Sequence, residues 1–77
     1  MNSITITTEY IRLDEALKLA NAVMSGGEAK LQIQAGMWKV NGDICTMRGK
    51  KLRAGDTFEP FTGGVVWEVT VACPSGN

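Results

Sequence analysis

The densest group of chemically useful side chains in this 77-residue sequence is a run of cations in its middle third. Residues 36–55 carry a single acid, Asp43, and five basic side chains: Lys39, Arg48, Lys50, Lys51 and Arg53. Arginine presents a planar pair of N–H donors to a phosphate or a base edge, and lysine presents a mobile point charge. The chemistry that this stretch predicts is the binding of phosphate groups.

The basic stretch stands out because the rest of the chain is acidic. The whole sequence has a formal net charge of zero, yet residues 36–55 sum to +4, between flanking segments of −1 (residues 1–35) and −3 (residues 56–77). Segregated charge creates a local field that attracts anions even when the total charge vanishes. The alternative is a basic loop that only solvates a small domain, and the charge pattern alone does not decide between the two.

The sequence offers little for catalysis or metal binding. It contains no histidine, which removes the commonest general base and metal ligand. Asp14 and Glu15 are adjacent, so they do not face each other on a helix, and they suit the first turn of one. Cys45 and Cys73 lack the close spacing of a metal-binding pair, and we expect two reduced thiols. We therefore expect no enzymatic activity, no metal and no cofactor.

Size and composition predict one small globular domain over residues 1–77. A content of 44% hydrophobic and 21% charged residues is ordinary for such a domain, and a chain this short has room for one thin core. It has no apolar run of the roughly 20 residues that span a membrane. Residues 1–10 lack the basic start and apolar block of a secretory signal. We expect a cytoplasmic monomer without membrane contact.

The first half of the chain predicts a strand and two helices. Residues 4–8 alternate isoleucine and threonine, which indicates a short strand that could lie at the edge of a sheet. A helix over residues 13–24 would carry one apolar face, formed by Leu13, Leu17, Ala20 and Met24. A second helix follows the capping box Ser25-x-x-Glu28 and ends at Gly36, with Ala29 and Ile33 toward the core. Residues 29–35 also alternate as a strand would, but the two helix signals favour the helix.

The second half predicts two hairpins. Asn41-Gly42 is the preferred pair for a two-residue turn, here between residues 37–40 and 43–47, with Val40 and Ile44 facing inward. The other hairpin joins residues 57–61 to 65–71 around Gly63-Gly64. Val65, Trp67, Val69 and Val71 would share one face of the last strand. We place Trp67 in the core, leave Trp38 open, and expect a disordered tail over residues 74–77. Two helices on a small, mostly antiparallel sheet make an α+β fold.

Four motifs in this order resemble a known family. They are Arg12-Leu13-Asp14-x-x-Leu17, Ala29-Lys30-x-x-Ile33-x-x-Gly36, Val40-Asn41-Gly42 and Gly55-Asp56. Together they resemble the RNA-binding S4 domain, named after a small-subunit ribosomal protein and also called the alpha-L motif, over about residues 12–58. The segments Ser25-Gly26-Gly27-Glu28-Ala29-Lys30 and Arg48-Gly49-Lys50-Lys51-Leu52 are similar to those of the small stand-alone bacterial members. The strand over residues 65–71 extends beyond the motif.

The resemblance implies a non-enzymatic module that binds structured RNA, such as ribosomal RNA, with its two helices and the following hairpin. Carried over position by position, the implied contact residues are Arg12, Lys30, Asn41, Arg48, Lys50 and Lys51. Geometry and charge add Gln34, Lys39 and Arg53. The family often has Ser-Arg where this chain has Gly26-Gly27, so we expect Arg48, Lys50 and Lys51 to contribute more of the binding here.

Each of these residues also has a structural explanation. Arg12 could cover the start of the first helix with its aliphatic stem, Lys30 could pair with Glu28, and Asn41 is needed for its turn. The alternative function is a protein-interaction module that uses the exposed edge of the strand over residues 65–71, or an exposed Trp38.

Overall fold

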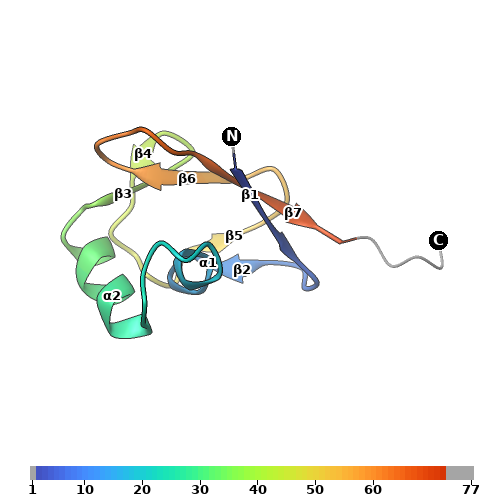
Figure 1. Ribbon diagram of the computed structural model, residues 1–77, viewed down its shortest axis with the longest axis horizontal. Helices are drawn as coiled ribbons and strands as arrows, with labels where there is room; N and C mark the ends of the chain where they lie inside the picture. Colours follow the sequence, from blue (N-terminus) through green and yellow to red (C-terminus); the bar gives the residue numbers. More distant parts are fainter. Residues whose placement is uncertain (1, 73–77) are drawn as a thin grey trace.

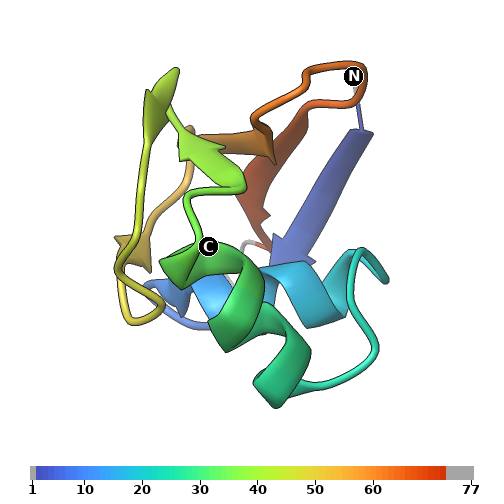
Figure 2. The same ribbon diagram turned by 90° about the vertical axis from the view of Figure 1, so that its left-hand side faces the viewer.

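The computed structural model describes residues 2–72 as two helices, a five-stranded sheet and a separate two-stranded ladder. The helices are α1 (Leu13–Leu19) and α2 (Gly26–Gln34). The sheet has the order β1-β7-β6-β3-β4, with β1 (Asn2–Ile6), β7 (Trp67–Val71), β6 (Thr57–Pro60), β3 (Trp38–Val40) and β4 (Asp43–Ile44). The ladder pairs β2 (Ile11–Arg12) with β5 (Lys51–Leu52). Figure 2 shows both helices on the same side of the sheet.

The pairing pattern confirms the predicted α+β class. Strand β1 runs parallel to β7, and the other pairs, β7–β6, β6–β3 and β3–β4, are antiparallel. Strand β1 lies at one edge of the sheet, as its sequence predicted, although it spans residues 2–6 rather than 4–8. The first and last strands of the chain, β1 and β7, are therefore neighbours in the sheet. The helices and the basic stretch come from the part of the chain between these two strands.

The core lies between the helices and the inner face of the sheet. Its fully buried large side chains are Leu13, Leu17, Ile33, Leu52, Phe58 and Val69. Three aromatic rings pack together beside them, with Phe58 and Trp67 stacked at 5.5 Å between centroids and Trp38 tilted at 6.0 Å from Trp67. Burial of large apolar side chains is the main favourable term in folding a domain of this size.

Helix α2 forms as predicted. The Ser25 hydroxyl accepts a hydrogen bond from the Glu28 amide at 3.2 Å, and the Glu28 carboxylate accepts one from the Met24 amide at 2.8 Å. At the other end, Gly36 has a φ of 77°, and the Met37 amide donates to the Gln32 carbonyl. This is the Schellman arrangement, in which glycine adopts the left-handed conformation. Ala29 and Ile33 are buried, as expected.

Helix α1 is shorter than predicted. It ends at Leu19, because Asn21 adopts a left-handed φ of 59° and the Ala22 amide donates to the Leu17 carbonyl. The helical face was therefore wrong at its last member: Met24 is 92% exposed, and Val23 enters the core in its place. Asparagine is the residue after glycine that best tolerates this conformation, so Asn21 was the overlooked stop signal.

The Asn41-Gly42 turn is confirmed, but one side chain next to it was misplaced. Both residues have positive φ, 52° and 89°. In a two-residue hairpin Val40 pairs with Asp43, and Lys39 pairs with Ile44. Directly paired residues lie on the same face, so Val40 points inward while Ile44 follows Lys39 outward and is 57% exposed. The strand predicted over residues 43–47 is only two residues long.

The protein-interaction alternative loses the two features that first motivated it. Trp38 is buried, and its indole N–H donates to the Gln32 side chain at 2.9 Å. Strand β7 is hydrogen-bonded on both sides, to β1 and β6, so it offers no free edge. Val65 lies before β7 rather than within it, and Val69 is the fully buried member of the expected apolar face.

Two expectations lie outside the described residues: the thiol of Cys73 and the tail over residues 74–77. The reduced state of Cys45 stays a prediction; its thiol donates to the Met47 carbonyl at 3.6 Å. Among residues 2–72, neither helix has the length and apolar character needed to cross a membrane.

Candidate nucleic-acid interface

The basic loop is held against the start of α1 by its backbone. The Leu13 amide donates to the Lys50 carbonyl at 2.8 Å, and the Asp14 amide donates to the Arg48 carbonyl at 3.1 Å. The first amides of a helix have no partner within the helix, and here the loop supplies them. The helix start and the loop therefore fix each other, which places the backbone of Arg48 and Lys50 at the start of α1.

The β2–β5 ladder brings two more cations together. Arg12 is directly opposite Lys51, and Ile11 is directly opposite Leu52. Leu52 is fully buried and Ile11 is half-buried, while Arg12 and Lys51 are exposed. Figure 1 shows β2 and β5 next to each other beside α1. Because paired residues share a face, the ladder turns its apolar pair to the core and its two cations outward. We call Arg12, Arg48, Lys50 and Lys51 the cationic cluster.

Arg12 is anchored by one neighbouring acid. Its guanidinium donates to Asp14 Oδ2 at 3.1 Å, and the other carboxylate oxygen of Asp14 accepts from the Glu15 amide at 2.8 Å. The Asp14 side chain is nearly buried, and that of Arg12 remains 47% exposed. A guanidinium has five N–H donors, so this contact orients Arg12 and leaves donors for a ligand.

The other members of the cluster have no acidic partner in residues 2–72. The ion pairs in this part of the chain join Arg12 to Asp14, Lys18 to Glu15 and Arg53 to Glu9. Arg48, Lys50 and Lys51 are all exposed and take part in none of them. Three like charges within four residues repel one another, and a bound anion would relieve that repulsion.

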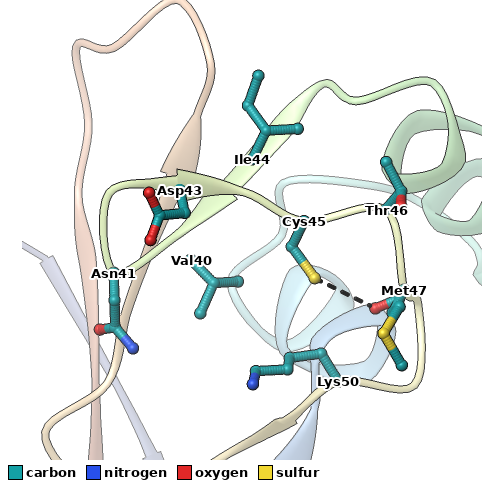
Figure 3. Close-up of a pocket in the computed structure, with 8 residues that line it drawn as sticks. All are labelled: Val40, Asn41, Asp43, Ile44, Cys45, Thr46, Met47 and Lys50. Atoms are coloured by element: carbon teal, nitrogen blue, oxygen red, sulfur yellow. Dashed lines mark hydrogen bonds between the residues drawn. The ribbon is translucent and has the colours of Figure 1, made fainter.

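Lys50 faces a shallow hollow between the β3–β4 turn and the loop. The hollow has a volume of about 390 Å³. Figure 3 shows the side chains of Val40, Cys45 and Lys50 directed into it, with Lys50 extending toward Asn41, whereas Ile44 points away. A ligand that reached this hollow would meet the Lys50 ammonium group.

Four further predicted residues come from other elements, namely β3, the β3–β4 turn and α2. Lys39 lies opposite Glu59 on the outer face of the sheet. The Asn41 side chain is occupied within the protein, accepting from the Thr57 amide at 3.0 Å and donating to Asp56 at 3.1 Å. Lys30 and Gln34 are exposed on α2, which packs against α1.

Arg53 leads to a residue that sequence reasoning missed. Its guanidinium pairs with Glu9 at 3.5 Å and lies 5.5 Å from the centre of the Tyr10 ring, and the Lys51 ammonium lies 4.9 Å from the same ring. The sequence offered only a weak signal, an aromatic residue two positions before Arg12, and aromatic side chains near cations are common at nucleic-acid sites. It was missed because the pairing of β2 with β5 was not predicted.

No three His, Cys, Asp or Glu side chains converge as metal ligands in the described part of the chain. The arrangement of two helices, sheet and ladder, with cations where the loop meets α1, agrees with the S4 fold that the sequence resembles. The chain belongs to the S4 domain family, whose model matches residues 4–69. The resemblance seen over residues 12–58 is thus confirmed, and the match extends into β1 and β7.

The chain is also similar to a particular bacterial protein. The chain is 43% identical over 58 residues to the probable ribosome maturation protein RlbA of Bacillus subtilis (strain 168). The matched region covers 75% of this chain and 82% of the relative.

Proposed function

We propose that this chain is a non-catalytic, monomeric module that binds structured ribosomal RNA through the cationic cluster. The observation that carries the proposal is the loop of residues 48–51, whose three cations have no acidic partner in residues 2–72 while its backbone is bonded to the start of α1. Membership of the S4 family supports RNA as the ligand. The name of the Bacillus relative supports a ribosomal target.

The geometry favours recognition of RNA shape. Backbone hydrogen bonds hold the loop that carries Arg48, Lys50 and Lys51. RNA binding therefore costs conformational entropy in these side chains but not in the loop backbone. The loop is too short to follow a long duplex, and three cations within four residues suit phosphates that converge at a folded RNA feature. Lys30 on α2 and Arg53 after β5 extend the proposed surface beyond the cluster.

Reversing two charges tests the proposal. The double variant Lys50→Glu with Lys51→Glu should lose measurable binding to ribosomal RNA fragments in a filter-binding assay. Both side chains are exposed, so thermal unfolding of the variant should remain cooperative. If the folded double variant binds RNA as tightly as the parent, the cationic cluster is not the contact surface.

A matched pair of single variants separates local contact from net charge. Lys51→Gln and Lys39→Gln remove the same charge, but Lys39 lies on the outer face of the sheet. Each phosphate contact contributes about 0.7–0.9 to the slope of log affinity against log salt, so three to four contacts give about −2 to −4. Lys51→Gln should make this slope shallower by roughly 0.7–0.9, and Lys39→Gln should leave it unchanged. Equal changes in both variants would contradict the proposed surface.

The second candidate function is protein interaction through β1. Within residues 2–72 this strand is hydrogen-bonded only to β7, so its outer edge is open, and open edges accept an added strand. Affinity capture from cells with and without RNase distinguishes the candidates. Ribosomal partners that are lost on RNase treatment support RNA binding, and partners that are retained support the β1 edge.

A further inference from the structure

Tyr10 is the only tyrosine of the chain, and it stands at the border of the cationic cluster. Its residue is 37% exposed, so the core does not account for it. The Lys51 ammonium and the Arg53 guanidinium lie 4.9 and 5.5 Å from its ring centre. Cations at this distance are attracted to the ring, and they restrict where the ring can point.

A surface hollow adjoins the ring. It has a volume of about 460 Å³ and is lined by Thr8, Tyr10, Ile11, Arg12 and Glu15. Two acids near the hollow are already ion-paired, Glu15 with Lys18 at 3.3 Å and Glu9 with Arg53 at 3.5 Å. A flat, uncharged group could therefore enter beside Tyr10 while an attached phosphate met Arg12 or Lys51.

We propose that Tyr10 stacks on one unpaired base of the bound RNA, with Arg12 and Lys51 on the adjoining phosphates. This inference rests on the proposed RNA-binding function and narrows its ligand to RNA that carries an extruded nucleotide beside a helix. Bases inside a continuous duplex are already stacked, whereas a bulged or looped base offers a free π face to an aromatic side chain. The cation contacts hold the ring in place, which lowers the entropy lost on stacking.

The competing explanation is that Tyr10 only positions Lys51 and Arg53. The two roles differ in their dependence on salt. If Tyr10 stacks on a base, its loss weakens RNA binding, but the number of phosphate contacts and of released counterions is unchanged. The slope of log affinity against log salt therefore stays the same. Loss of cation positioning removes phosphate contacts, so the slope becomes shallower.

The test compares Tyr10→Leu and Tyr10→Phe with the parent on two synthetic RNA hairpins, identical except for a single bulged adenosine. For the bulged hairpin, Tyr10→Leu should weaken binding by roughly 5- to 150-fold, which is the effect of one base–aromatic stack, at an unchanged salt slope. Tyr10→Phe keeps the ring and should retain most of the affinity. Thermal unfolding of each variant provides the folding control.

Two outcomes would overturn the inference while the proposed function stands. One is a folded Tyr10→Leu variant that binds both hairpins like the parent. The other is an equal loss on both hairpins with a shallower salt slope, which assigns Tyr10 to cation positioning. A parent protein that binds neither these hairpins nor ribosomal RNA fragments would instead contradict the proposed function itself.

Discussion

Asn41 stands at a position where the family resemblance implies RNA contact, but its side chain is hydrogen-bonded within the protein. It has a left-handed φ of 52°, and its side chain accepts from the Thr57 amide and donates to Asp56. Asp56 in turn accepts from the Arg53 amide at 2.7 Å. Asn41 therefore joins the β3–β4 turn to the turn before β6, and its amide group has little left to offer a ligand.

We expect Asn41→Ala to lower the free energy of unfolding by about 1–3 kcal/mol, because it removes hydrogen bonds and strains the left-handed backbone. Asn41→Gly relieves the strain but not the lost bonds, so it should destabilise less. Denaturant unfolding measures both. An Asn41→Ala variant with parental stability and lost RNA binding would instead make Asn41 a direct contact.

The residues of the proposed contact surface differ in how well the sequence alone could place them. Arg48, Lys50 and Lys51 stand out as charges in sequence, and the structure leaves them free of acidic partners within residues 2–72. Tyr10 could not be placed beside them, because its neighbours come from a strand forty residues away. Ile44 was misplaced because its direction depends on a one-residue register that the turn sets.

At the level of elements, a helix could be predicted correctly where the sequence contains signals for both its start and its end. Helix α2 has a capping box at its start and a glycine after its end, and both function as predicted. Helix α1 has no side-chain cap on Arg12, and loop carbonyls from residues 48 and 50 take over that role. Strand β5 is two residues long and exists only through its pairing with β2, so no local pattern could reveal it.

The early end of α1 gives a prediction for that element. Asn21 has a φ of 59°, which glycine adopts without strain and alanine does not. The free energy of unfolding of Asn21→Gly should lie within about 0.5 kcal/mol of the parent value, whereas that of Asn21→Ala should be lower by about 1–2 kcal/mol. Both follow from thermal or denaturant unfolding. Similar stability of Asn21→Ala and the parent would mean that the helix can continue past Leu19.

At the scale of the whole molecule, a chain with no net charge has two differently charged faces. The charged residues on the outer face of the sheet include two acids, Glu59 and Glu68, and one base, Lys39. The cationic cluster lies instead where the loop and the ladder meet α1. A polyanion should therefore dock on the ladder and loop, and the outer face should be repelled from it.

The most direct measurement of this central claim is a map of amide chemical-shift changes during titration of the labelled protein with a ribosomal RNA fragment. We expect the largest changes at residues 10–12 and 48–53, with further changes on α2 near Lys30, and small changes at Ser3, Glu59 and Glu68. Changes concentrated on the outer face of the sheet or along the open edge of β1, with residues 48–53 unaffected, would contradict the account.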